Sequence, residues 1–194
     1  REGEPFRPSP CHRLDIGTGG LLLIGKTRQG AAGISLQLAN RSVSKTYTAI
    51  VVGKLEAPGR TELLLSNQAA VTLYTPLRCV PSVTWKHMTL VRLSPLTGRK
   101  HQLRRHMAAL GFPMLGDRKF RSEFGVDING GLCLWASAIE IRHPISNRRM
   151  LLTEDPPPRF EAILNKEEAR FLKRQAKEAE RENGLLQPTP ATLA

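Results

Sequence analysis

The sequence predicts an α+β domain built on a mostly antiparallel mixed sheet flanked by helices. Segments with the two-residue alternation of strands dominate the chain, and only a few segments between them show the spacing of a helix. Two strand-like segments, 71–80 and 84–93, are separated by a short turn at Pro81 and Ser82, so we expect them to pair. With 194 residues and 40% hydrophobic side chains, the chain is long enough to bury a core.

The N-terminal part contains three further predicted elements. The apolar run 21–24 follows a glycine-rich turn at 15–20 and predicts a buried strand. Residues 29–40 predict a short helix, because apolar side chains recur four positions apart. Residues 43–52 alternate and predict a strand that ends at Gly53. One face of this strand would carry Val43, Lys45, Tyr47, Ala49 and Val51.

The central and C-terminal parts predict a helix and two more strands. Residues 97–111 predict a helix that Thr97 caps and Gly111 closes. Residues 132–141 alternate and predict a strand, with residues 149–153 as its antiparallel neighbour. The buried stripe of the predicted helix would consist of Leu103, Met107 and Leu110.

The charged segment after residue 158 sets the predicted domain boundaries. It has the spacing of a helix, and the polar end of the chain follows it. We therefore predict a globular domain over 1–164, a charged helix over 165–183 and a disordered tail over 184–194. The side chains expected to dock the helix are Phe160, Ile163, Leu164 and Phe171.

The charge balance favours a polyanion as partner, with nucleic acid as the first candidate. The chain has 29 Lys and Arg against 17 Asp and Glu, a formal net charge of +12. Residues 165–194 contain six basic and five acidic residues, which leaves 23 basic and 12 acidic residues in 1–164. The apolar runs are far shorter than the roughly 20 residues that span a bilayer, so we expect no membrane span.

Motifs for several common chemistries are missing from the sequence. Cys11, Cys79 and Cys133 are widely spaced without a CxxC, which favours neither a disulfide framework nor a zinc site and fits a reducing compartment. There is no HExxH, no GxxxxGK[ST] and no dinucleotide fingerprint. His101 and His106 are five positions apart, so they would diverge on a helix instead of forming a metal pair. We therefore expect neither a metal nor a cofactor.

Two clusters of residues have the chemistry for a site. Asp15 stands beside Arg13 at a glycine-rich turn, where the backbone can bend and leave room for a ligand. An aspartate at a turn is, however, more often a turn or capping residue. The second cluster is 98–106, GRKHQLRRH, in which Arg104 borders the apolar stripe and can reach inward. A basic run of this kind is equally often a solvated face.

Four motifs in a fixed order resemble the RluA-type RNA pseudouridine synthase family. They are HRLDIGTGGLLL, SKTYTAIVVG, TGRKHQLRRHMAALGFPMLGD and LCLWASAIEIRHP, all within residues 12–144. The corresponding family patterns are HRLDxxTSGLLL, KxYxAxVxG, GRxHQ(I/L)RxHxxxxGxPIxGD and LxLHAxxLxxxHP. The resemblance implies the pseudouridine synthase catalytic fold over 1–164, with the family's first core strand expected upstream of the first residue.

The resemblance also implies a role for each motif residue. Asp15 would be the catalytic aspartate, Tyr47 would lie against the target base, and Arg104 would pair with the aspartate. Leu134 would line the pocket, and Arg13 would occupy the space of the extruded uridine. Residues that could hold phosphates are Arg99, Lys100, Arg105, Arg118, Arg142, Arg148 and Arg149.

The implied reaction detaches uracil N1 from ribose C1′ and rejoins the base through C5. One carboxylate suffices for this isomerisation, provided that water is kept out. Arg104 would keep Asp15 ionised in a partly buried pocket. A hydrolytic glycosidase commonly needs a second carboxylate as general acid, and none neighbours the motif residues in sequence. This favours isomerisation over hydrolysis.

Three positions depart from the family patterns and keep other hypotheses open. Gly17 replaces an acidic residue, Gly19 replaces Ser, and Trp135 replaces His, which would add bulk beside Leu134. A second hypothesis is therefore an RNA-binding assembly factor or chaperone that retains the fold but has little turnover. A third is a glycosylase, which would release free uracil.

The altered turn, the basic character and the charged C-terminal helix make the chain similar to the mitochondrial, RNA pseudouridylate synthase domain-containing members of the family. This similarity implies the mitochondrial matrix as location, with nucleus or cytoplasm as the alternative. It also implies an organellar mRNA or rRNA substrate and mitochondrial RNA-granule or ribosome-assembly proteins as partners. The catalytic unit would be a monomer.

Overall fold

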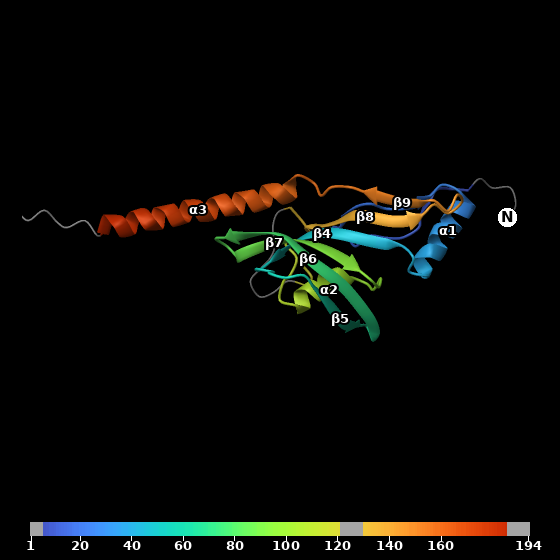
Figure 1. Ribbon diagram of the computed structural model, residues 1–194, viewed down its shortest axis with the longest axis horizontal. Helices are drawn as coiled ribbons and strands as arrows, with labels where there is room; N and C mark the ends of the chain where they lie inside the picture. The colour runs from blue at the N-terminus through green and yellow to red at the C-terminus, as the bar shows by residue number, and fades with distance from the viewer. Residues whose placement is uncertain (1–5, 121–129, 186–194) are drawn as a thin grey trace, which may run out of the picture.

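A seven-stranded sheet forms the centre of the computed structural model, which describes residues 6–120 and 130–185 (Figure 1). Its strands are β2 (Gly19–Gly20), β4 (Ser44–Val52), β5 (Gly59–Leu65), β6 (Gln68–Ser82), β7 (Lys86–Pro95), β8 (Leu134–Arg142) and β9 (Arg149–Thr153). The order is β2-β8-β4-β7-β6-β5, and β9 pairs with β8. Only β2 and β8 pair in parallel, so the predicted α+β class with a mostly antiparallel sheet is confirmed.

The alternation of β4 divides the hydrophobic core between the two faces of the sheet. Ala49 and Val51 belong to a cluster that includes side chains of α2 (Gln102–Ala109). Ile50 and Val52 belong to a second cluster that includes side chains of α3 (Arg159–Leu185). The helices α2 and α3 therefore cover opposite faces of the sheet, as Figure 1 shows. The alternating pattern predicted for this strand is confirmed.

The N-terminal segment differs from the buried strand predicted over 21–24. The short strands β1 (Ser9–Pro10) and β3 (Ile24–Gly25) pair with each other, while β2 pairs with β8. Leu22 and Ile24 are exposed, because only the side facing α1 (Arg28–Ala39) is covered. The helix α1 lies within one residue of its prediction, and Thr27 Oγ1 caps it by accepting a bond from Gly30 N–H.

Two other elements differ from the sequence predictions. The strand β5 was not predicted, because its three consecutive leucines break the two-residue alternation. The helix α2 begins at Gln102 instead of near Thr97, and Leu110 at its end is 36% exposed instead of buried. The pairing of β6 with β7, and of β8 with β9, agrees with the predictions.

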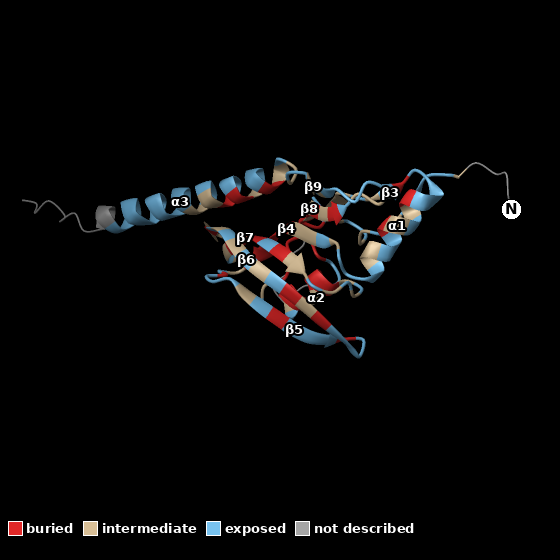
Figure 2. Cartoon of the chain, turned by 45° about the vertical axis from the view of Figure 1, so that its right-hand side comes forward, coloured by how far each residue is buried: buried red, intermediate tan, exposed pale blue. Residues whose placement is uncertain are grey.

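The long helix α3 is docked at one end and exposed at the other. Phe160 and Leu164 are fully buried against the sheet, whereas Phe171 is only half-buried. Its C-terminal half extends past the sheet and is exposed almost throughout (Figure 2). Most of the predicted tail, residues 186–194, lies outside the described residues. No helix in the described part of the chain is both long and apolar enough to cross a membrane.

Candidate active site

A cavity of about 290 Å³ opens between the loop around Asp15, the first half of β4, the loop before α2 and the start of β8. The lining residues that the sequence analysis had singled out are Arg13, Asp15, Tyr47, Arg99, Lys100 and Leu134. Arg104 and Arg105, also candidates, do not line the cavity. Four segments that are distant in sequence therefore meet at one site.

A tight turn holds Asp15 at the cavity. The Thr18 N–H donates to the Asp15 carbonyl (2.9 Å), and Gly17 in the middle of the turn has φ +87°. A side chain at residue 17 would be strained by this φ, so glycine here fits the turn geometry. The Asp15 side chain is 22% exposed, which leaves the carboxylate reachable from the cavity.

A hydrogen bond of His12 connects the chain before Asp15 with the chain after it. Its Nε2 accepts a hydrogen bond from the Leu23 backbone N–H (3.0 Å), so the ring is neutral there and its proton is on Nδ1. Burial, and next the charge of Lys45, lower the pKa of His12 below its usual value. Protonation at Nε2 would break the bond to Leu23. His12 is thus a structural residue that positions the chain before Asp15.

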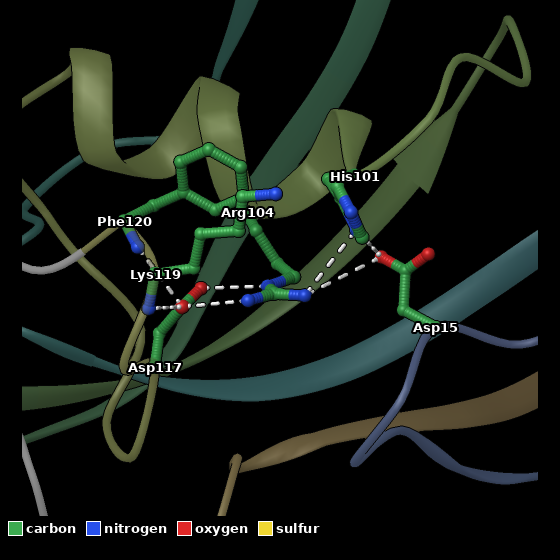
Figure 3. Close-up of polar contacts among 6 residues, drawn as sticks. All are labelled: Asp15, His101, Arg104, Asp117, Lys119 and Phe120. Atoms are coloured by element: carbon green, nitrogen blue, oxygen red, sulfur yellow. Dashed lines mark hydrogen bonds and ion pairs between the residues drawn. The ribbon is translucent and has the colours of Figure 1, made fainter.

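Arg104 is held by a buried two-point ion pair with Asp117 (Figure 3). Its Nε and Nη2 donate to the two carboxylate oxygens, each at 2.7 Å, and its guanidinium lies over the Phe120 ring. Asp117 is 1% exposed and also accepts the backbone N–H groups of Lys119 and Phe120. Burial opposes the charge of Asp117, yet the bonds from Arg104 and these N–H groups keep the pKa of its carboxyl below the usual value.

The third guanidinium nitrogen of Arg104, Nη1, faces the loop that carries Asp15. Arg104 Nη1 lies 3.9 Å from Asp15 Oδ2, at the outer limit of an ion pair. The sequence analysis expected Arg104 to pair with Asp15, whereas its short bonds go to Asp117. The fixed guanidinium still places a positive charge beside the Asp15 carboxylate.

His101 makes the shortest polar contact of the Asp15 carboxylate in the described part of the chain, and it was not among the predicted site residues. His101 Nδ1 lies 3.0 Å from Asp15 Oδ2 and 3.3 Å from Arg104 Nη1. A ring nitrogen can donate to a carboxylate or accept from a guanidinium but not both, and the shorter contact, with Asp15, favours the proton on Nδ1. The residue has φ +55°, just before α2, and this unusual backbone turns its ring toward Asp15. Its signal in the sequence was the GRKHQ motif.

Gln102 fixes the loop that carries His101. Its Oε1 accepts from the Thr97 hydroxyl and the Arg99 N–H, and its Nε2 donates to the Val71 carbonyl and the Thr72 hydroxyl. Thr97 is therefore not the helix cap that was predicted. The loop is instead fastened to β6, because a buried amide can satisfy four polar partners at once.

Tyr47 and Lys45 reach the cavity from the same face of β4. The pairing of β4 with β8 shifts register between Thr46 and Tyr47. Burial, and next the negative charge of Asp15, raise the pKa of Tyr47 to about 12, so its phenol is protonated near neutral pH. Burial lowers the pKa of Lys45. Lys45 was not among the predicted site residues, although it is the first position of the KxYxA motif.

Two departures from the family patterns, Gly19 and Trp135, contact each other. A Cβ atom added at Gly19 would lie 2.3 Å from Cζ3 of the Trp135 ring, so the ring occupies the space of a side chain there. Trp135 packs in the cluster on the α3 face of the sheet, whereas Leu134 belongs to the opposite cluster. The expected bulk beside the pocket-lining Leu134 is thus wrong, because neighbouring residues of a strand face opposite sides.

The charged groups that line the cavity are mostly basic. Asp15 is the one acidic side chain among the lining residues that the structure describes, and it faces Arg13, Lys45, Arg99 and Lys100. Asp117 is the nearest other carboxylate in the Arg104 network, and its lowered pKa makes it a poor proton donor. The cavity therefore combines a single carboxylate with a basic lining that suits a polyanion. It lacks the acid and base pair of a hydrolytic glycosidase within this lining.

Comparison with known proteins identifies the family of the chain. The model of the family described as RNA pseudouridylate synthase matches residues 1–109. The dual-specificity RNA pseudouridine synthase RluA of Pasteurella multocida is 36% identical over 167 residues, which cover 78% of this chain and 74% of the relative. The tRNA pseudouridine synthase C of Vibrio vulnificus is 36% identical over 174 residues, covering 74% and 70%.

Two solved structures share the fold. They are human RNA Pseudouridylate Synthase Domain Containing 1, with a TM-score of 0.69 and 23% identity, and Domain Containing 4, with 0.63 and 24%. They cover 78% and 82% of this chain and 70% and 76% of their own. The shared fold and the matches to the family model and to the two synthases define an RNA pseudouridylate synthase domain. The chain belongs to the RNA pseudouridylate synthase family, in its RluA-type branch, and is an RNA pseudouridine synthase.

Proposed function

We propose that Asp15 is the catalytic aspartate with which this synthase isomerises specific uridines in a structured RNA. The observation that carries the proposal is the position of its carboxylate, which lines the cavity and lies 3.0 Å from His101 Nδ1 and 3.9 Å from Arg104 Nη1. Both neighbours hold the carboxylate at the cavity, where it can attack as a nucleophile. The enzyme needs no oxidant, reductant or water for an isomerisation.

In the proposed reaction, a carboxylate oxygen of Asp15 attacks ribose C1′, and N1 of uracil leaves with the bonding electron pair. The detached base turns within the cavity, and C5 then attacks C1′ and displaces the carboxylate. The proton on C5 is lost and N1 gains one, so the product has the same atoms as the substrate. Exclusion of water from the cavity prevents hydrolysis of the intermediate.

Tyr47 has two tasks in this proposal. Its ring offers a face for the uracil, and its protonated phenol can donate a hydrogen bond to the base. The charge of Asp15 is one of the two causes that raise the pKa of Tyr47. The carboxylate is consumed in the covalent intermediate and regenerated when C5 displaces it, so it is again an anion beside Tyr47 when C5 loses its proton.

The basic rim would hold and open the RNA. Arg13 is exposed at the cavity mouth, where its guanidinium can fill the gap left by the extruded uridine. Arg99 and Lys100 line the neighbouring wall and would bind the flanking phosphates. Arg105 lies outside the lining and would contact RNA farther from the target base. Leu134, which is buried, would form the apolar floor beneath the uracil.

We further propose a mitochondrial mRNA or rRNA as the substrate, in the matrix, with RNA-granule or ribosome-assembly proteins as partners. Support comes from the sequence resemblance to the domain-containing members and from the basic composition. Fractionation of cells that express the full-length protein, with matrix markers, tests the location. Recovery in the nucleus or cytoplasm would overturn it.

A pseudouridine map of cellular RNA tests the main proposal. The map is made from cells that lack the protein and from cells rescued with wild type or with Asp15→Ala. We expect sites that are lost without the protein and restored by wild type alone. If Asp15→Ala restores the sites, Asp15 is not the catalytic residue. If Asp15→Ala restores every phenotype but not the sites, the result favours the assembly-factor hypothesis. Free uracil in the reaction would indicate a glycosylase.

A further inference from the structure

The exposed half of α3 carries its basic side chains along one face. A shallow groove of about 510 Å³ runs between this half and the turn at Val83. Its charged lining consists of Arg170, Lys173, Arg174, Lys177, Arg181 and one acid, Glu178. Each of these five basic residues stands three or four positions from another of them, so all five lie on one side of the helix. We call them the arm surface.

Three acidic residues in the first half of α3 form side-chain bonds. Glu161 and Glu168 both pair with Arg78 of β6, at 2.6 and 2.7 Å. Glu167 is buried and accepts from the Ser82 hydroxyl as well as from Arg170. These bonds hold the first half of the helix on the sheet.

Three cations of the arm surface are left without a carboxylate. Arg170 pairs with Glu167 and Arg174 with Glu178, at 2.5 and 2.8 Å. Lys173, Lys177 and Arg181 make no ion pair with any residue that the structure describes. All three are exposed. The groove therefore presents uncompensated positive charge to solvent.

The arm surface is separate from the catalytic cavity. The cavity lies on the α2 face of the sheet, lined by Tyr47 and Leu134, whereas α3 packs on the opposite face and extends past the sheet edge (Figures 1 and 2). The stretch from residue 170 to residue 181 is about 16 Å long, which matches roughly five stacked nucleotides. This length suits a strand of nucleic acid better than a single phosphate.

We propose that the arm surface is a second RNA-binding site, which holds the phosphate backbone of a segment remote from the target uridine. The inference rests on the RNA substrate of the proposed function. Uncompensated Lys and Arg side chains favour a polyanion, and Val83 is the one apolar residue in the lining, which disfavours an apolar protein or lipid partner. The arm would thus enlarge the RNA footprint without touching the base.

Binding of a fluorescein-labelled 30-nucleotide oligouridine, followed by fluorescence anisotropy over a series of KCl concentrations, tests the proposal. The arm variant carries Lys173→Gln, Lys177→Gln and Arg181→Gln, because Gln keeps helix propensity while it removes charge. We expect binding roughly tenfold weaker at low salt and a salt slope smaller by about 2, since each single-strand phosphate contributes about 0.7.

The matched control removes the same charge at the opposite end of the molecule. It carries Arg7→Gln, Lys26→Gln and Arg28→Gln, all exposed residues near α1 (Figure 1). We expect its affinity and slope to stay close to wild type. Equal losses of affinity in both variants would mean that net charge alone attracts the RNA, which would overturn the proposal. Wild-type binding by the arm variant would overturn it as well, in favour of an unrelated role for the helix.

A further variant separates this proposal from that of the active site. Asp15→Asn should bind the oligouridine with the wild-type slope and form no pseudouridine. If Asp15→Asn still forms pseudouridine, the catalytic proposal fails while the arm proposal is judged by its own variants. If the arm variant binds normally while Asp15→Asn is inactive, the arm proposal alone fails.

Discussion

Arg104 and Asp117 form a buried two-point ion pair behind the wall of the catalytic cavity, with both bonds at 2.7 Å. The pair orients the guanidinium so that its remaining nitrogen faces Asp15 at 3.9 Å. Asp117 thereby acts on Asp15, the proposed catalytic residue, through Arg104, without lining the cavity itself. The charge beside Asp15 is set by a residue more than a hundred positions away in the sequence.

Asp117→Asn should lower both stability and activity. Removing one charge of a buried pair leaves the other uncompensated, and such changes cost about 3–5 kcal/mol. Released from Asp117, Arg104 also loses its orientation toward Asp15. Urea denaturation should show the loss of stability, and tritium release from [5-³H]uridine RNA should show the loss of activity. Glu140→Gln, which breaks the exposed pair with Arg149, is the control and should change neither measurement appreciably.

His101→Phe should slow the chemical step more than it weakens RNA binding. Phenylalanine keeps a ring near Phe120 but removes the donor to Asp15, and loss of a single oriented donor to a reacting group costs about 10²-fold or more in rate. His101→Gln retains a donor and should recover part of the rate. Single-turnover kinetics with saturating enzyme separate the two effects. A rate equal to wild type in His101→Phe would remove His101 from the mechanism.

Acidification from about pH 7 to pH 5 should destabilise the fold through His12 and His106. Burial lowers the pKa of both, followed by Lys45 for His12 and by Arg105 for His106. A lowered pKa in the folded state means that the unfolded state binds protons more readily between the lowered value and 6.5. Stability is therefore full above 6.5 and falls as the pH drops through that window. The lowered pKa of Asp117 places its own titration below this range.

Urea denaturation at several pH values measures this effect. His106 is fully buried, with Nδ1 2.9 Å from the Thr72 hydroxyl, so it should contribute strongly. The variant His106→Gln cannot titrate and should show a shallower dependence of stability on pH than wild type. An unchanged slope in this variant would exclude His106 as a source, and a flat wild-type profile would contradict both assignments.

The sequence could predict elements that depend on local pattern. The alternation of residues 43–52 fixed which side chains of β4 face α2, because strand neighbours always point to opposite sides. The prediction for Thr97 was wrong, because a Thr before a helical segment is commonly its cap. Only the tertiary contacts show that the Thr97 hydroxyl donates to Gln102 instead. The three consecutive leucines of β5 show no hydrophobic periodicity, so the sequence could not distinguish a strand from a helix there.

The features of the candidate site also fall into those that a local motif predicts and those that depend on tertiary contacts. Asp15, Tyr47 and Leu134 lie in motifs that identify them directly, and the structure brings all three to one cavity. The tie between Asp117 and Arg104 depends on how the chain folds back, which no local pattern reveals. The near balance of six basic and five acidic residues in 165–194 likewise concealed the arm surface, because a net charge contains no information about faces of a helix.

The contact between Gly19 and Trp135 predicts a coupled pair of substitutions. Gly19→Ser places a Cβ 2.3 Å from the Trp135 ring, so the ring or the turn must shift, and overpacking of this kind costs about 1–3 kcal/mol. Trp135→His alone leaves a gap beside Gly19 and removes the bond from Trp135 Nε1 to the Glu154 carbonyl (3.2 Å). It should therefore also destabilise the fold.

The double variant Gly19→Ser with Trp135→His restores the residue types of the family pattern at both positions. We expect its loss of stability in urea to be smaller than the sum of the two single losses, because the smaller ring vacates the space that the serine needs. Additive losses would mean that the two departures arose independently and that the turn relaxes without the ring. Since the Trp135 ring lies on the α3 face, activity should follow stability in all three variants.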